Sequence, residues 1–421
     1  MRFSIGVFCL LLPVLALAQN PTPKDVRLVA KDGQSAIPKL ALYLNSPSLD
    51  TRIEVVKQLT ELGGKDSIDP LIQATRDADP EMQMRAIDGL VNFYLPGYVK
   101  SGPAASLARV GSSIKAKFSD TNDQVIDGFV TVRPEVITAI GKLASGGNGM
   151  EVRESACRAI GILRGRAALP DLYEALRTKD SDVMYEALVA IRKIRDPQAG
   201  PRIVYLLRDL DDRVQSTAIE DAGVLQAKDG LPTLRGIVAS PRGSKAERAA
   251  LNAIAMMPDA SDRALMQRYL TNKDDRLREA AVEGLARIGD PGDKAAIEKI
   301  WRDDDKMAPR LASAFALTMD GDLSLAESSP FRYLLNTLNS SSWRDTASAY
   351  LVEAARKPNV LAALKEPLAT GTRDEKIMLS RILAVSGDSS SIPWLEAASR
   401  DPDTNVAQEG LKALRTLRAR L

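Results

Sequence analysis

Few residues in this chain have side chains suited to catalysis. The 421-residue sequence contains no histidine, so neither an imidazole base nor an imidazole metal ligand is available. It has two cysteines, and Cys9 lies in a segment that we expect to be removed from the mature protein. Cys157 remains as a candidate nucleophile, but it has no imidazole to activate it and no adjacent cluster of metal ligands. We therefore expect Cys157 to be a small buried apolar residue.

Neighbouring carboxylates are the second candidate chemistry. The pair Asp211-Asp212 and the run Asp303-Asp304-Asp305 could in principle exchange protons with a substrate. Both stand where the pattern predicts turns between helices, and aspartate is favoured there as a helix N-cap. We interpret these residues as caps, and the sequence predicts no catalytic residue, no cofactor site and no metal site.

The elements that must position any site follow from a repeat of 31 residues. Within one unit, Val183, Ala187, Ile191 and Ile194 fall on one face of a helix. A proline then begins a second apolar series, and proline suits the first turn of a helix, where its missing N–H has no intrahelical partner. Each unit is therefore predicted to be a helical hairpin, with small alanines letting neighbouring helices approach closely. The recurring positions are Val152, Val183 and Val214; Ala156, Ala187 and Ala218; Leu163, Ile194 and Leu225; and Pro170, Pro201 and Pro232.

The period organises most of the chain. A flexible N-terminus and half-repeat cap (19–34) should precede repeats at 35–97, and a longer array should cover 133–421, with a surface loop near Asp320–Pro330. The insertion 98–132 does not fit the repeat. Its stretch Ala104–Phe118 could form a basic amphipathic helix that lies on a membrane surface or docks on a partner. Alternatively, it belongs to an enlarged repeat unit whose apolar side packs onto its neighbours.

The N-terminus predicts export. Residues Met1–Ala18 combine Arg2, an apolar run and small residues at Ala16-Leu17-Ala18, as secretory signals do. The apolar run is too short for a transmembrane anchor, which needs about 20 residues. Removal of the segment leaves 56 basic and 55 acidic groups. This near-neutral balance gives no field that would attract nucleic acid, and we expect a periplasmic or extracellular protein.

Several strings resemble HEAT repeats, in particular the short type named after phycobilisome lyases. They are Glu151-Val152-Arg153, Leu169-Pro170-Asp171-Leu172 and Leu277-Arg278-Glu279-Ala280-Ala281, with Ile288-Gly289-Asp290-Pro291. The resemblance implies an all-α fold, an α-solenoid of stacked hairpins in a right-handed superhelix, whose concave surface binds protein partners. The related deoxyhypusine hydroxylase binds its metal through His-Glu pairs, which the lack of histidine excludes. The bilin lyases act in the cytoplasm, in conflict with an export signal.

The sequence therefore favours an exported, non-catalytic scaffold that binds proteins through its concave face and through the insertion 98–132. An enzyme or lyase-type subunit with a site in the concave groove is the alternative, and peripheral membrane attachment through 104–118 is a third. The inner helices carry both signs of charge, which suits a protein or peptide better than a nucleic acid. Polar positions expected to line the groove include Arg158, Glu186, Gln215, Asp221 and Glu283. Candidate partner-binding residues are Arg109, Lys115, Lys117, Phe118, Arg153, Arg192 and Trp394.

Two tryptophans receive opposite interpretations. Trp394 follows a repeat proline at a position that is polar in other units, so it either anchors a partner or covers the open end of the last unit. Trp343 falls on a core offset, as does Phe315, and both are expected to be core residues.

Overall fold

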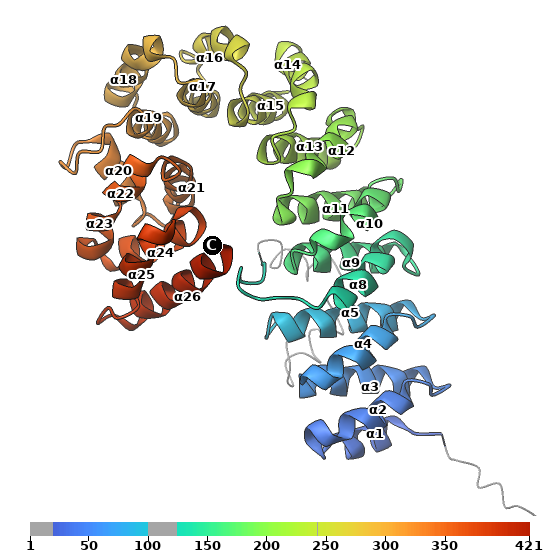
Figure 1. The fold of residues 1–421 in the computed structure, drawn as a ribbon. Helices are drawn as coiled ribbons and strands as arrows, with labels where there is room; N and C mark the ends of the chain where they lie inside the picture. The colour runs from blue at the N-terminus through green and yellow to red at the C-terminus, as the bar shows by residue number, and fades with distance from the viewer. Residues whose placement is uncertain (1–19, 100–123, 242) are drawn as a thin grey trace, which may run out of the picture. The chain divides into compact units, whose positions relative to one another are not determined.

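The computed structural model describes residues 20–99, 124–241 and 243–421, and in these ranges it contains helices and no β-strand. The chain divides into two units, Met1–Ser101 and Gly102–Leu421. The helices of each unit follow one another as stacked hairpins (Figure 1). The predicted all-α solenoid is therefore confirmed, while the handedness of its superhelix stays a prediction.

The first unit contains five described α-helices. Its first helix lies within the predicted cap: Thr22 caps it, Pro23 begins it, and it packs against α3. Gly63 ends α3 in the left-handed conformation, with a φ of 63°. The helices are α1 (Pro23–Ala30), α2 (Ile37–Tyr43), α3 (Leu49–Leu62), α4 (Ile68–Ala74) and α5 (Pro80–Tyr94).

The second unit holds the longer array. Its helices alternate between one that begins near a repeat proline and one that carries the four apolar offsets, until the pattern loosens after α19. They are α8 (Pro134–Gly146), α9 (Met150–Ile162), α10 (Leu169–Ala175), α11 (Ser181–Ile194), α12 (Gly200–Ile203), α13 (Asp212–Val224), α14 (Leu231–Ala239), α15 (Ser244–Met256), α16 (Arg263–Tyr269), α17 (Asp275–Ile288), α18 (Lys294–Asp303), α19 (Met307–Met319), α20 (Pro330–Thr337), α21 (Arg344–Ala354), α22 (Pro358–Ala363), α23 (Lys365–Thr370), α24 (Arg373–Ser386), α25 (Ile392–Ala398) and α26 (Thr404–Arg420).

One repeat shows how the sequence produces the hairpin. In α11, Asp180 caps the N-terminus by accepting hydrogen bonds from the backbone N–H groups of Asp182 and Val183. The offsets Val183, Ala187 and Ile191 are fully buried. The proline-led helix α10 is shorter than the periodicity suggested, because a 3₁₀ turn at Arg166–Ala168 precedes it. Similar turns precede α12, α14, α16, α18 and α25, and the sequence pattern did not predict them.

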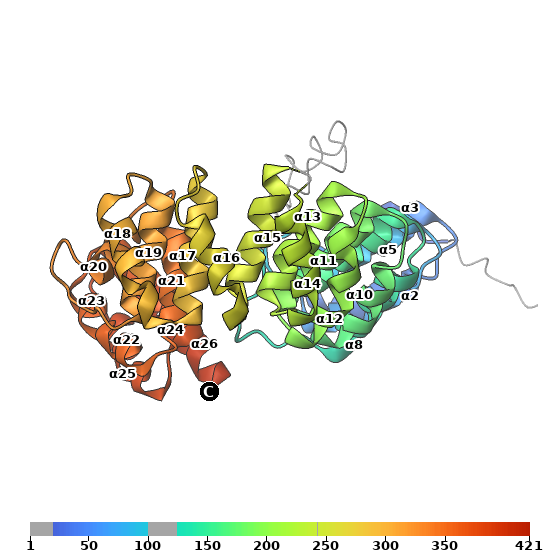
Figure 2. The same ribbon diagram turned by 90° about the horizontal axis from the view of Figure 1, so that it is seen from above.

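Close packing joins neighbouring helices of the second unit. Within this unit, α11, α13, α15, α17 and α19 lie on the inner side of the arc, and the proline-led helices lie outside (Figure 1). Figure 2 shows the same helices from above. The repeat alanines Ala156, Ala187 and Ala218 are fully buried. A methyl group added to Gly161 would lie 2.9 Å from the Cα atom of Ala190 on the next inner helix. Small residues thus set the spacing, as predicted.

A polar network joins α17, α19 and α21. Arg287 donates two 2.8 Å hydrogen bonds to the Glu353 carboxylate and one of 2.8 Å to Glu283. The buried Tyr350 hydroxyl donates to Glu283 at 2.5 Å, and its ring stacks on Phe315 with 4.8 Å between centroids. These contacts connect α17 directly with α21, although α19 is the inner helix between them in the chain.

Several irregular stretches have defined structures. The loop between α19 and α20 covers 320–329, as expected, and the less regular part of the array after it contains the helices α22, α23 and α24. The outer helix α12 has only four residues and continues as a 3₁₀ turn at Val204–Arg208. Phe315 is buried as expected, but the core prediction for Trp343 is wrong: it is half-buried, precedes α21 and lies 5.1 Å below Arg276.

The predicted signal segment and the predicted helix 104–118 lie outside the described residues, so both stay predictions. The domain boundaries also stay predictions. Across the described ranges, no helix is long and apolar enough to cross a membrane.

Candidate protein-interaction surface

The inner helices α9, α11 and α13 end in an unusual way. Arg164, Arg195 and Gln226, one at the end of each helix, have φ angles of 49°, 56° and 56°. Glycine takes this left-handed conformation at the ends of α3 and α17, at Gly63 and Gly289. A side chain in this region is unfavourable by about 1–2 kcal/mol, because its Cβ approaches the following carbonyl. Three successive repeats therefore present a large polar side chain where glycine would fit more easily.

Arg164 and Arg195, here called the arginine pair, are exposed and close enough to influence each other. Partial burial and the positive charge of Arg195 lower the pKa of Arg164, whereas the negative charge of Asp127 opposes this shift. Neither guanidinium makes an ion pair or hydrogen bond with any residue in the described ranges. Their charge is therefore not used to hold the repeats together.

The end of the insertion lies beside the arginine pair. We call residues 124–133 the strap. The Ile126 backbone N–H donates a 3.0 Å hydrogen bond to the carbonyl of Ile162, at the end of α9. Asp127 forms a 2.6 Å ion pair with Lys412 of α26, and Gly128 lies against Thr416. The strap therefore connects the C-terminal helix to the end of an inner helix near the arginine pair.

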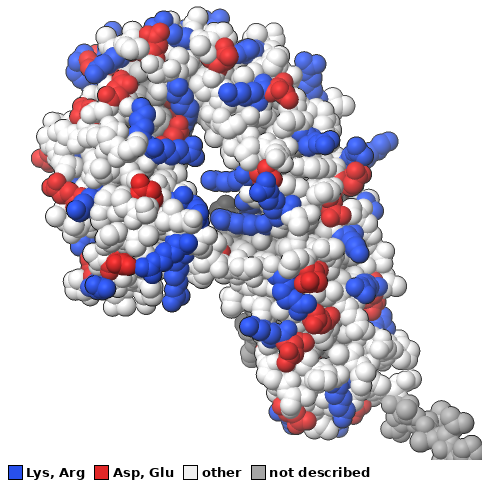
Figure 3. Space-filling model, viewed as in Figure 1, with Lys and Arg blue, Asp and Glu red and all other residues white. Residues whose placement is uncertain are grey.

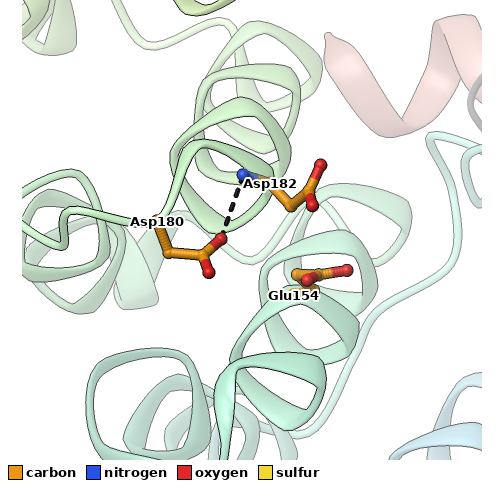
Figure 4. A group of neighbouring side chains, drawn as sticks. All are labelled: Glu154, Asp180 and Asp182. Carbon is orange, nitrogen blue, oxygen red and sulfur yellow. Dashed lines mark hydrogen bonds between the residues drawn. The ribbon is translucent and has the colours of Figure 1, made fainter.

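Three carboxylates form an acidic cluster at the other end of α9 and α11 (Figure 4). One oxygen from each of Glu154, Asp180 and Asp182 lies within 4.8 Å of the others. Burial and the charge of Asp182 raise the pKa of Glu154 to about 7, although Arg158 acts in the opposite direction. Such a set could hold a hard cation or exchange a proton. However, Asp180 already caps α11, and Asp182 is paired with Arg213.

Many charged side chains of the array join one repeat to the next instead of facing a partner. Arg158 and Glu186 form a buried 2.7 Å pair between α9 and α11. Further inter-repeat pairs are Arg166–Asp196, Arg192–Glu220, Arg235–Asp262, Arg263–Asp293 and Arg278–Asp304. Blue and red side chains accordingly mix over much of the surface in Figure 3. The predicted mixture of signs is present, but a large part of it serves the stack.

Five polar residues expected to line the groove are instead buried, and that prediction is wrong for them. Inner helices pack side by side, so these positions fall in the contacts between neighbours. Asp221 is fully buried at the position where the adjacent repeats have Ala190 and Ala253. Burial raises the pKa of Asp221 to about 8, despite Arg192 at 3.4 Å. The five residues are Arg158, Glu186, Gln215, Asp221 and Glu283.

The candidate binding residues are not brought together. Arg153 is half-buried near the start of α9, where its Nε–H points to the Gly147 carbonyl at 3.5 Å. Arg192 is half-buried near the end of α11 and pairs with Glu220 at 3.0 Å. Trp394 is half-buried on α25. Arg109, Lys115, Lys117 and Phe118 lie outside the described residues.

Cys157 is fully buried, and burial raises the pKa of its thiol. A thiol that resists ionisation is a poor nucleophile. The environment agrees with the structural role expected from the sequence.

Comparisons with known proteins agree with the fold. A family model described as HEAT repeats matches residues 37–107, 137–223 and 244–318, more than half of the chain. The chain belongs to the HEAT-repeat family. No curated protein matches this HEAT-repeat chain in sequence.

Solved structures with similar folds include the CpcE–CpcF complex of phycocyanin lyase from Nostoc sp. PCC7120, at 18% identity and a TM-score of 0.36, covering 65% of this chain and 94% of that chain. Others are YibA of E. coli, at 14% identity and a TM-score of 0.40 (70% and 95% covered), and human deoxyhypusine hydroxylase, at 14% and 0.28 (68% and 96% covered).

Sequence reasoning missed the arginine pair, although a signal was present. Aligning the HEAT repeats places Arg164 and Arg195 after the last apolar offset, where Gly63 and Gly289 stand in other repeats. A missing helix-ending glycine at a periodic position indicates that another property is needed there. The nearness of Asp127 could not be inferred, because it depends on the path of the strap.

Proposed function

We propose that this protein is an exported, non-catalytic HEAT-repeat scaffold that binds a protein partner through the inner side of its second unit. One observation carries the proposal: the arginine pair holds two exposed positive charges in a conformation that glycine adopts at lower free energy. Because neither charge stabilises the stack through an ion pair in the described ranges, recognition of an acidic surface accounts for them best.

The strap supports a role for the insertion in the same surface. The contacts of Ile126 and Asp127 fix the end of the insertion 98–132 beside α9 and α26. An element that interrupts the repeat is not required for repeat packing, so its position next to the arginine pair suits partner selection. Vesicle flotation of the full protein and of a 104–118 deletion tests the alternative of membrane attachment.

A second candidate function is favoured by Glu154. A carboxyl with a pKa of about 7, beside two further carboxylates, resembles the general bases of enzymes. This environment supports the alternative of an enzyme or lyase-type subunit. A Glu154→Gln variant distinguishes the enzyme from the scaffold. It would abolish a Glu154-dependent reaction and leave partner binding at the arginine pair unchanged.

Site-specific photo-crosslinking in the native host tests the scaffold. A photoreactive residue at Gln226 or Tyr185 reports on inner helices, and one at the exposed Tyr205 or Arg202 reports on the outer side. We expect a discrete protein adduct from the inner positions, lost when Arg164 and Arg195 are changed to Gln. Adducts from the outer positions alone would contradict the proposal. Cell fractionation of the same strains tests export.

A further inference from the structure

Arg310 differs from the other arginines of the inner helices in its surroundings. Arg192, Arg248, Arg278 and Arg287 each pair with a carboxylate on a neighbouring helix or turn. Arg310, on α19, is half-buried and makes no ion pair or hydrogen bond through its side chain with any residue that the structure describes. Its charge is therefore not neutralised within this part of the chain.

Two aromatic rings hold the Arg310 guanidinium in place. Its Cζ atom lies 5.3 Å from the ring centroid of Trp301 and 5.2 Å from that of Tyr333. The rings meet edge to face with 5.0 Å between centroids, and the Tyr333 hydroxyl contacts Met307 Sδ at 2.9 Å. The Nε atom is buried without an acceptor, and the terminal nitrogens are not among the buried atoms. We call Trp301, Arg310 and Tyr333 the clamp.

Comparable arginines show what the clamp lacks. Arg213 lies over Tyr185 and pairs with Asp182, whereas Arg276 lies over Trp343 and pairs with Glu279. In each case the ring covers the guanidinium face, and a carboxylate takes the N–H groups at its edge. The clamp supplies the ring contacts without the carboxylate. Arg202 and Arg268 also lie over a tyrosine and make no ion pair with a described residue, but both are exposed and contact a single ring.

We infer that the clamp binds an Asp or Glu side chain in an acidic segment of a protein partner. A guanidinium that is held against two aromatic rings, and whose terminal N–H groups have no partner among the described residues, is preorganised for a carboxylate, which accepts two parallel N–H groups. Tryptophan, tyrosine and arginine are also the residue types that dominate binding energy at protein interfaces. The inference deepens the proposed scaffold function, but it uses residues separate from the arginine pair, so each can fail alone.

Selection from a random dodecapeptide display library tests the inference. The purified protein and its Arg310→Met variant are used as separate targets, and selected peptides are measured by Trp301 fluorescence. Trp343→Phe and Trp394→Phe substitutions leave Trp301 as the sole tryptophan of the three. We expect selected peptides to share an Asp or Glu. They should bind at least tenfold more weakly to Arg310→Met, and also after their acid is changed to the amide.

Controls separate the clamp from general effects. Arg268→Met removes another arginine that lies over a tyrosine and pairs with no carboxylate of the described residues, and it should leave peptide binding unchanged. Circular dichroism should show the same helicity for Arg310→Met and the parent protein. Peptides without an acid, or with equal affinity for Arg310→Met, would overturn the inference. So would a fluorescence response to sodium sulfate with no acidic peptide selected, because the site would then bind free oxyanions. If the protein with Arg164 and Arg195 intact forms no adduct from Gln226 or Tyr185 but still binds the selected peptides, the scaffold function alone is refuted.

Discussion

The second unit joins its inner helices differently in two regions. From α9 to α15, small residues bring adjacent helices together, with Gly161 against Ala190 and Gly223 against Ala253. From α17 to α21, large side chains form the contact, and Arg287 and Tyr350 connect α17 with α21. The first region uses nearest-neighbour contacts, as expected of a solenoid. The second region adds contacts between helices that are not adjacent in the array, α17 and α21.

The difference separates two ways of stabilising an array. Where small residues bring two backbones close together, a larger side chain destabilises the contact. In a buried polar network, removal of one charged partner destabilises the protein because the other charge stays buried without it. Substitutions that add volume should therefore act in the first region, and substitutions that remove a charge should act in the second.

The largest effect is expected in the polar network. Arg287→Met leaves Glu283 and Glu353 close together without their shared cation, which should destabilise the protein by about 3–5 kcal/mol. Hydrogen exchange should show faster exchange in α17 and α21 than in α9 and α11. Arg302→Met, at an exposed position of α18, serves as the control. Equal stability of the two variants would show that the network is not essential.

Overpacking tests the first region. Ala187→Leu places three additional carbon atoms in a fully buried contact and should cost about 1–3 kcal/mol. Thermal unfolding measures the effect, with Ala264→Leu at an exposed position of α16 as the matched control. A parent-like melting temperature for Ala187→Leu would mean that this contact adapts without cost.

A pH dependence should distinguish the buried carboxyl between α11 and α13. The native pKa of Asp221 is about 8, whereas an unfolded Asp titrates near pH 4. The native state then binds more protons than the unfolded state between these values, so stability falls as pH rises from about 4 to 8. Asp221→Asn should reduce this fall and be more stable than the parent by about 1–2 kcal/mol at pH 8. Urea unfolding at pH 5 and 8 measures this difference, with Asp212→Asn, at an exposed position of α13, as the control. An unchanged pH profile for Asp221→Asn would contradict the assignment.

The smallest effect concerns the arginine pair. Arg195→Gly places glycine in a left-handed conformation and should stabilise the protein by at most about 1 kcal/mol. Arg195→Ala removes the same charge but keeps an unfavourable Cβ, so it should show no such gain. Melting temperatures of both variants separate conformation from charge. Equal gains would show that charge repulsion with Arg164 is the cause.

The repeat helices could be predicted because the apolar spacing that defines each helix lies within one short stretch of sequence. Val183, Ala187 and Ile191 specify one helical face whatever lies beyond it, and their burial agrees with that pattern. The residues of the candidate site could be predicted less well from the sequence. Arg153 and Arg192 lie on the same periodic helices but make local contacts, with the Gly147 carbonyl and with Glu220. Arg310 is distinctive because its side chain makes no ion pair or hydrogen bond with a described residue, and no sequence pattern shows this.

The sequence by itself determined the helical hairpin, its 31-residue period and the small residues that allow close stacking, because these depend on contacts within one unit and with the next. Only the tertiary structure decided which charged side chains form ion pairs between neighbouring repeats. It placed Glu283 next to Tyr350, Asp127 beside Lys412 and Arg310 against two rings. Each of these contacts joins segments whose separation in sequence has no fixed relation to their distance in space.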